Sequence, residues 1–231
     1  MSERVPETTT TLIQTPSQTV GPFFGYALPF GGGPNLVPGH HPQAIRLHGT
    51  VTDGAGDIIP DAMLEIWQAD AAGKRVQERG SLDRDGFTFT GFGRAPVTLG
   101  GHYTFTTVKP GSMSGGAPYV LVTIFARGLT HHLFTRIYFP EDAELHQDDR
   151  VLAAVGPERR ATLIAVADGP VGGVPSYRFD IRLQGEGETV FLDYDSANGI
   201  EPADRQYAAE GAVESADHSA VDSAAVETAH A

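Results

Sequence analysis

The segment Ile45-Arg46-Leu47-His48-Gly49-Thr50-Val51 alternates apolar or small side chains with polar ones, and the turn residues Asp53-Gly54 and Gly56-Asp57 follow it. A period of two is typical of a β-strand with one buried face. Further short segments are rich in β-branched and aromatic residues and are bounded by Gly, Pro or Asp, which also favours strands. They are residues 63–68, 87–89, 102–106, 120–125, 133–139, 161–166, 177–183 and 190–192. Many short strands at this spacing predict an all-β fold, a β-sandwich.

Composition divides the chain into three regions. Residues 1–44 form an extended Pro-rich N-terminal arm that also carries several aromatic rings, and it either crosses its own sandwich or packs on a partner subunit. Residues 45–195 form the β-sandwich domain, in which residues 148–155 are the one segment that looks helical. Residues 196–231 form an acidic, Ala-rich tail. Because residues 201–231 carry seven acids against one base and almost no aromatic side chains, we expect this tail to be disordered.

Composition also excludes several classes of function. The 231 residues carry 29 Asp and Glu against 16 Lys and Arg, a formal net charge of −13, so we expect no nucleic-acid and no membrane partner. No cysteine is present, which excludes disulfides, thiolate metal ligands and thiol nucleophiles. The first residues lack the pattern of a signal peptide, and we expect a cytoplasmic protein. The histidines follow no HxH or HExxH pattern, so the residues alone predict no self-contained catalytic or metal site.

Several motifs in a fixed order give this sequence a family resemblance. They are Thr15-Pro16-Ser17-Gln18-Thr19-Val20-Gly21-Pro22-Phe23-Phe24, Leu64-Glu65-Ile66-Trp67-Gln68-Ala69-Asp70, Gly91-Phe92-Gly93-Arg94 and Thr107-Val108-Lys109-Pro110-Gly111. In this order they resemble the intradiol ring-cleavage dioxygenases. The segments 125–129, 135–139, 159–165 and 177–191 are similar, more narrowly, to the alpha subunits of the protocatechuate 3,4-dioxygenases. The resemblance covers residues 12–194 and implies the β-sandwich of that family.

The resemblance also implies where iron would bind. Family members that hold non-heme Fe(III) use two Tyr and two His, and the surrounding motifs place these four positions at Arg75, at or next to Met113, and at Tyr119 and Leu121. A cation, a thioether, one phenol and an alkyl group do not form a site for Fe(III), a hard ion that needs phenolate and imidazole donors. We therefore expect this chain to bind no iron. The resemblance assigns the Fe(III) to a beta subunit that shares the sandwich fold.

In the resembled enzymes the alpha subunit helps to close the pocket of the beta subunit. The positions that do so map to Thr19, Gly21, Pro22 and Arg127. The implied substrates are protocatechuate and O2, with 3-carboxy-cis,cis-muconate as the product. Arg127 would attract or orient the substrate carboxylate, or it forms an ordinary ion pair at the rim of a subunit.

Two other interpretations of the whole chain stay open. One is a non-catalytic β-sandwich binding or assembly module derived from the same fold, which the absent ligands would support. The other is an independent dioxygenase with a different metal site, for which the sequence offers no alternative cluster of ligands.

Overall fold

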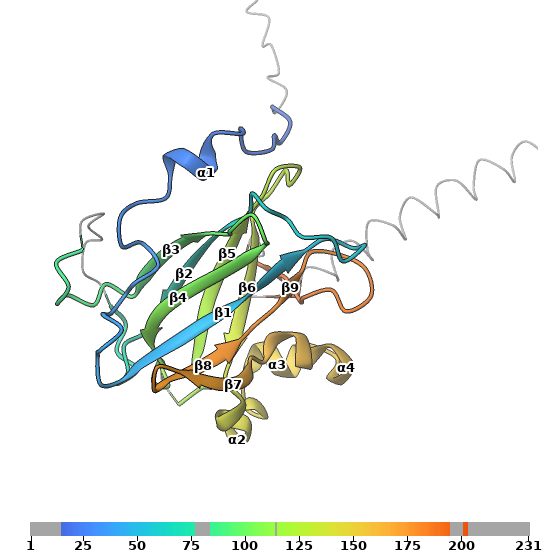
Figure 1. The fold of residues 1–231 in the computed structure, drawn as a ribbon. Helices are drawn as coiled ribbons and strands as arrows, with labels where there is room; N and C mark the ends of the chain where they lie inside the picture. Colours follow the sequence, from blue (N-terminus) through green and yellow to red (C-terminus); the bar gives the residue numbers. More distant parts are fainter. Residues whose placement is uncertain (1–14, 77–83, 114, 195–200, 203–231) are drawn as a thin grey trace, which may run out of the picture.

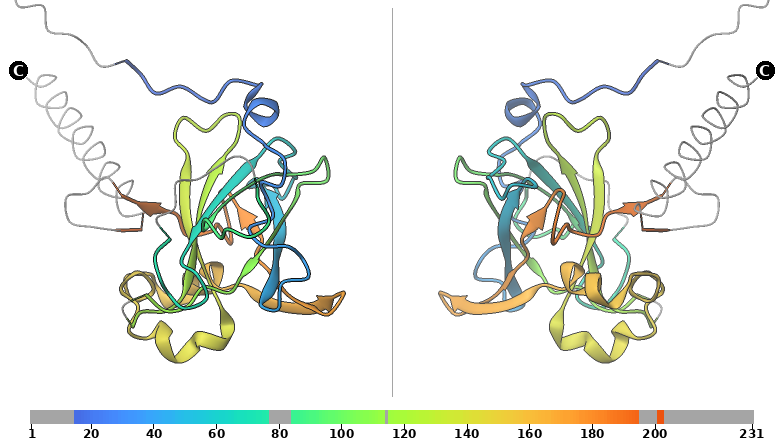
Figure 2. Two further views of the ribbon diagram at one scale, coloured as in Figure 1. Left: turned by 90° about the vertical axis from the view of Figure 1, so that its left-hand side faces the viewer. Right: turned by 90° about the vertical axis from the view of Figure 1, so that its right-hand side faces the viewer.

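The computed structural model describes residues 15–76, 84–113, 115–194 and 201–202, and two β-sheets pack face to face in it (Figure 1, Figure 2). The first sheet has the order β4-β1-β8-β7, with β9 also paired to β1. Its strands are β4, His102–Val108; β1, Ala44–Thr52; β8, Val174–Arg178; β7, Val166–Val171; and β9, Ile181–Arg182. The second sheet has the order β11-β10-β6-β5-β2-β3. Its strands are β11, Glu201–Pro202; β10, Leu192–Asp193; β6, Leu133–Tyr138; β5, Tyr119–Phe125; β2, Met63–Gln68; and β3, Phe92–Pro96. The all-β sandwich predicted from the sequence is confirmed.

The hydrophobic core lies between the two sheets. On β1, Leu47 and Val51 are fully buried, while the residues between them are partly exposed or lack a side chain. The second sheet contributes further side chains with no exposed surface, which are Leu64, Ile66, Val120, Val122, Ile124 and Ile137. The burial on β1 follows the period of two in its sequence, which confirms the strand predicted at residues 45–51.

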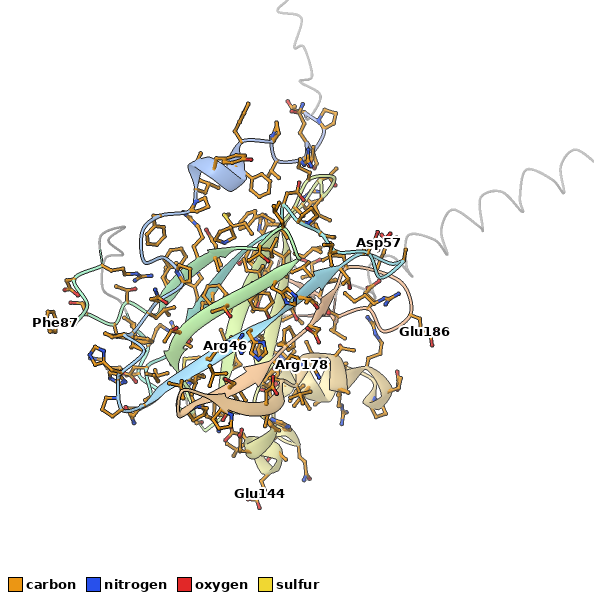
Figure 3. The ribbon with its side chains drawn as sticks, in the orientation of Figure 1. Arg46, Asp57, Phe87, Glu144, Arg178 and Glu186 are labelled. Atoms are coloured by element: carbon orange, nitrogen blue, oxygen red, sulfur yellow. The ribbon has the colours of Figure 1, made fainter. Side chains whose placement is uncertain are left out.

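Most of the other predicted strands are present, but the one at residues 87–89 is wrong. There, Asp85 Oδ1 accepts hydrogen bonds from the backbone N–H groups of Phe87 and Thr88, and Asp85 Oδ2 accepts one from the Thr88 hydroxyl. Such local side-chain bonds compete with the pairing of a strand. Phe87 is 96% exposed and points away from the sheets (Figure 3). The edge of the second sheet is formed instead by β3, which the sequence did not predict.

The strand predicted at residues 161–166 is also wrong. The chain forms α4, Pro157–Arg160, and the 3-10 turn η2, Ala161–Leu163, and the strand β7 begins only at Val166. Proline is favoured at the start of a helix because its missing N–H has no partner to lose there. The Thr162 hydroxyl donates to the Arg159 carbonyl at 2.8 Å, which stabilises the turn further.

The remaining helices are short. The helix predicted at residues 148–155 is confirmed as α3, Arg150–Ala154. Its N-cap is Asp149, whose side chain accepts from the backbone N–H groups of Val151 and Leu152. The others are α1, Phe24–Ala27; η1, Pro140–Asp142; and α2, Ala143–His146. In the described part of the chain no helix has the length and apolar character needed to cross a membrane.

One part of the N-terminal arm covers its own sandwich. Leu36 donates its backbone N–H to the Thr106 carbonyl at 2.8 Å, and Thr106 donates to the Pro34 carbonyl at 2.9 Å. The rings of Phe30 and Phe92 stack with their centroids 6.4 Å apart. Residues 30–37 therefore lie as a strap on their own sandwich.

The preceding part of the arm projects beyond the sheets and is joined to them at Leu28, whose carbonyl accepts from Arg94 Nη1 on β3 at 2.6 Å. Residues 15–28, including α1, extend beyond the sandwich in each view (Figure 1, Figure 2). Phe23 is 76% exposed and Tyr26 is 87% exposed. For this segment, packing on a partner subunit stays a prediction. Residues 1–14 of the arm lie outside the described residues, as does the predicted tail apart from β11, which pairs with β10.

Candidate functional site

Two of the residues that the resemblance selects lie at one corner of the sandwich. Arg127 lies two residues after Phe125, the last residue of β5. The backbone N–H of the next residue, Gly128, donates to Thr19 Oγ1 at 2.7 Å. This bond joins the arm to the β5 end across 109 residues of sequence. Gly128 has a φ of +90°, a backbone conformation that glycine adopts without steric cost. This bond therefore holds Thr19 beside the backbone that follows Arg127.

Asp61 completes this corner, and the sequence did not indicate it. The antiparallel ladder between β2 and β5 pairs Met63 with Phe125. Continued by two residues, the same register places Asp61 opposite Arg127. Arg127 Nε donates a short hydrogen bond to Asp61 Oδ2, and the Arg127 side chain remains 60% exposed. Arg127 thus has an ion-pair partner and still presents much of its surface to solvent.

Gly21 and Pro22 lie on the exposed turn that leads into α1. The Phe24 N–H donates to the Gly21 carbonyl at 3.2 Å, which closes the turn. Within the described residues, a Cβ added at Gly21 would meet nothing within 4 Å. The described chain itself therefore gives no steric reason for a glycine at this position.

The two positions that the resemblance assigns to histidine ligands, Tyr119 and Leu121, lie on the outer face of the second sheet. Tyr119 and Leu121 are two residues apart on β5, so their side chains share a face. Arg136 on β6 is paired directly with Leu121, and its guanidinium carbon lies 3.9 Å from the centroid of the Tyr119 ring. Arg136 is only 8% exposed. A buried guanidinium therefore stands over the two positions.

The electrostatics around Arg136 keep it charged. Arg136 Nη1 donates to Tyr138 Oη at 3.2 Å, and Tyr138 Oη donates to Asp149 Oδ1 at 2.9 Å. Burial acts to lower the pKa of Arg136, but its contacts with Tyr138 and the neighbouring tyrosines outweigh burial and raise the pKa. Burial also raises the pKa of Tyr138 and of Tyr194. At neutral pH this face holds a permanent cation beside neutral phenols.

These residues do not fit an iron ion. Of the other two corresponding positions, Arg75 is exposed on the loop after β2 and Met113 is partly buried. The four positions thus hold one guanidinium, a thioether, one phenol and an alkyl side chain, and Arg136 adds a guanidinium beside Tyr119 and Leu121. Fe(III) needs anionic oxygen and imidazole donors. Among the described residues, no group of three or more His, Asp or Glu side chains is arranged to hold a metal ion.

Two cavities lie elsewhere in the described structure. One of about 400 Å³ is lined by Glu158, Arg159, Thr162, Gly185, Gly187 and Glu188. Another, of about 210 Å³, is lined by Gly32, Asn35, Leu36, Val37, Pro38, Arg84, Gly86 and Thr88. Neither contains Thr19, Gly21, Pro22 or Arg127. At the corner around Arg127, the Arg127 side chain itself is 60% exposed.

Comparison with known proteins assigns this architecture to a class. A dioxygenase family model matches residues 35–117, which run from the strap through β4. Among solved structures, the dioxygenase domain of a dioxygenase and carbohydrate-binding protein fusion from Streptomyces sp. SirexAA-E superimposes with a TM-score of 0.51. It is 21% identical in sequence, and the match covers 74% of this chain and 99% of that domain. The fold is thus that of a dioxygenase sandwich.

Closer relatives define the branch of the family. The alpha chain of protocatechuate 3,4-dioxygenase from Burkholderia cepacia is 43% identical over 197 residues, a match that covers 80% of this chain and 99% of the relative. The beta chain from the same organism is 29% identical over 160 residues, covering 64% and 67% of the two chains. The chain therefore belongs to the intradiol dioxygenase family and, within it, to the protocatechuate 3,4-dioxygenase alpha chains.

Proposed function

We propose that this chain is the non-iron-binding alpha subunit of a protocatechuate 3,4-dioxygenase. With a beta subunit it opens the ring of 3,4-dihydroxybenzoate between the two hydroxyls, and both atoms of O2 enter the product, 3-carboxy-cis,cis-muconate. The observation that carries this proposal is the match over 99% of an alpha chain, in a chain whose residues at the family's metal positions do not suit iron. We place the complex in the cytoplasm, as expected from the sequence.

The Fe(III) that the family uses would be bound by the beta subunit. The similarity to a beta chain supports a partner with the same fold, and the buried Arg136 beside Tyr119 argues against a metal in this chain. The positive charge of this guanidinium would repel a metal cation bound beside it. This chain then contributes pocket walls and an assembly surface.

The corner around Arg127 is the part of this chain that we assign to the substrate pocket. Thr19 is held to the Arg127 segment by the Gly128 bond, so the arm and the rim act as one unit. The turn at Gly21 and Pro22 follows directly, and the open space around Gly21 suits close approach by another chain or by the substrate. The Arg127 guanidinium, with its Nε engaged by Asp61, has two terminal amino groups to offer the protocatechuate carboxylate.

Exposed aromatic residues of the arm support the assembly role. Phe23 and Tyr26 present large apolar rings to solvent beside the pocket residues Gly21 and Pro22. Burying such rings stabilises an interface by roughly 1.5–3 kcal/mol per side chain. We propose that residues 15–28 pack on the beta subunit and carry the pocket residues to it.

Iron content and turnover of the separate and combined subunits test this function. The purified chain alone should hold no stoichiometric iron and show no ring cleavage, and the complex with its beta subunit should show both. Iron and protocatechuate cleavage in this chain alone would contradict the proposal. A stable complex that cleaves no catecholic substrate, although beta holds its iron, would favour the alternative of a non-catalytic assembly module.

A further inference from the structure

We propose that Asp61 is a positioning residue, which holds the Arg127 guanidinium in the orientation that receives the substrate carboxylate. This inference rests on the proposed function, since it concerns the same corner of the pocket. It adds a residue that belongs to none of the motifs of the family resemblance.

The pairing of β2 with β5 places Asp61 opposite Arg127. The β2–β5 ladder runs from the pair of Gln68 and Val120 to the pair of Met63 and Phe125. Just beyond it, Ala62 and Ala126 are 2% and 1% exposed and belong to the same core cluster. Two buried alanines therefore fix the backbone on both sides, and the next residues, Asp61 and Arg127, project outward from opposite strands.

The contact with Asp61 leaves the terminal amino groups of Arg127 available to a ligand. Asp61 Oδ2 accepts from Arg127 Nε, which is the nitrogen nearest to the side-chain stem. A carboxylate ligand binds an arginine best through two parallel hydrogen bonds from one edge of the guanidinium. With Nε bound to Asp61, the edge formed by the two terminal amino groups remains for such a ligand. Because the side chain is 60% exposed, the ion pair with Asp61 is the restraint on it that the described residues supply.

A second tether holds the backbone below the side chain. Gly128 donates to Thr19, and Leu129 donates its N–H to the Ala126 carbonyl at 3.4 Å, so the segment after β5 forms a closed turn. The backbone of Arg127 is thus held by the turn and the arm, and its side chain by Asp61. An unrestrained arginine would lose its rotamer freedom only on binding the substrate, which weakens binding.

Asp61 orients the Arg127 guanidinium, but its negative charge also offsets the positive charge of Arg127. These two effects predict opposite changes in the KM for protocatechuate when Asp61 is removed. If orientation dominates, removing Asp61 raises the KM for protocatechuate. If neutralisation of the Arg127 charge dominates, removing Asp61 frees a stronger cation and lowers this KM. We expect orientation to dominate because the bond is directed at Nε and the carboxylate itself is 28% exposed, where solvent screens its charge.

The experiment compares Asp61→Ala and Asp61→Asn in the assembled complex with the beta subunit. Asp61→Ala should raise the KM for protocatechuate about fivefold, with kcat changed less than twofold, since the restraint acts on binding. In Asp61→Asn the amide oxygen still accepts from Nε, so this variant should recover most of the affinity although its charge is lost. Asp57→Ala, an exposed acid on the same connection between β1 and β2 (Figure 3), is the matched control and should leave KM unchanged.

A double variant separates the failure of this inference from failure of the proposed function. In an Arg127→Ala background, Asp61→Ala should have no further effect on KM. If Arg127→Ala itself leaves protocatechuate and catechol kinetics unchanged, the proposed role of the corner is wrong. If Arg127→Ala raises KM but Asp61→Ala lowers it or leaves it unchanged, only the positioning role is overturned. The positioning role would also be overturned if Asp61→Ala raised the KM by the same factor in the wild-type and in the Arg127→Ala backgrounds.

Discussion

Replacing Arg127 with alanine separates a pocket residue from an ordinary surface ion pair. The Arg127 side chain is 60% exposed, and the ion pair that it forms has a carboxylate partner that is itself 28% exposed. Such a pair contributes about 0–1 kcal/mol to stability. Arg127→Ala should therefore lower the free energy of unfolding of this chain by no more than about 1 kcal/mol. Assembly with the beta subunit and the iron content of the complex should stay the same.

The expected effect on kinetics is larger than the effect on stability. A charge-assisted hydrogen bond from a guanidinium to a carboxylate contributes about 1.5–3 kcal/mol, and 1.4 kcal/mol corresponds to a tenfold change. The kcat/KM for protocatechuate should thus fall about tenfold or more, measured by steady-state O2 uptake with the assembled complex. Arg127→Lys keeps the charge but loses the planar fork, so it should recover only part of this loss.

A comparison of protocatechuate with catechol, and of Arg127→Ala with a matched arginine variant, shows which group of the substrate Arg127 contacts. Catechol lacks the carboxylate, so its turnover should hardly change if Arg127 binds that group, and both substrates should suffer if Arg127 acts on the ring oxygens. Arg178→Ala removes another exposed arginine that pairs with an exposed acid, Asp180, and should change neither. Unchanged kinetics of Arg127→Ala with both substrates would refute the reasoning and leave an ion pair at the rim.

Three further changes test the fold. In Gly49→Ala, the new Cβ would lie 1.9 Å from the Phe179 carbonyl oxygen, so the chain should be destabilised by about 3 kcal/mol or more in chemical denaturation, and a wild-type midpoint would contradict the packing described for β1. Burial lowers the pKa of His48 below 6.5, so the unfolded chain binds a proton more readily than the folded chain; the free energy of unfolding should fall as the pH drops below about 6.5, and His48→Gln should reduce this pH dependence. Asp149→Ala removes the N-cap of α3 and the acceptor of the Tyr138 hydroxyl, which should cost about 2–4 kcal/mol in the same denaturation assay, and a loss under 1 kcal/mol would argue against the buried bond.

Part of the candidate site follows from the sequence, because motifs of the family resemblance select its residues. The motif from Thr15 to Phe24 selects Thr19, and the motif from Phe125 to Leu129 selects Arg127. The structure brings both to one corner. The poor fit of Arg75, Met113, Tyr119 and Leu121, as a set, to an iron ion likewise follows from their chemistry, because one phenol is the only suitable donor among the four. The contacts of Asp61 with Arg127 and of Arg136 with Tyr119 were not predicted, since each joins residues on neighbouring strands that are far apart in the sequence.

Local competition explains the strand that was predicted wrongly at residues 87–89. Alternating Phe87 and Phe89 resemble a strand in sequence, but Asp85 binds the backbone groups that a strand partner would need. The signal was present as an Asp two residues before the first Phe. The aromatic content of the segment favoured a strand. The preference of Asp for turns was not counted, because it acts through hydrogen bonds that a count of apolar residues does not include.

The sequence by itself determined the class of fold, since a period of two in short segments is set by the alternation of side chains along an extended backbone. It also predicted that the residues at the positions that the resemblance assigns to the iron ligands do not suit iron, since donor chemistry belongs to the side chain. Only the tertiary structure decided that Asp61 faces Arg127 and that Arg136 covers Tyr119. Those pairs depend on the register between strands distant in sequence, which the packing of the two inward faces selects, and a shift by one residue would turn each side chain to the other face.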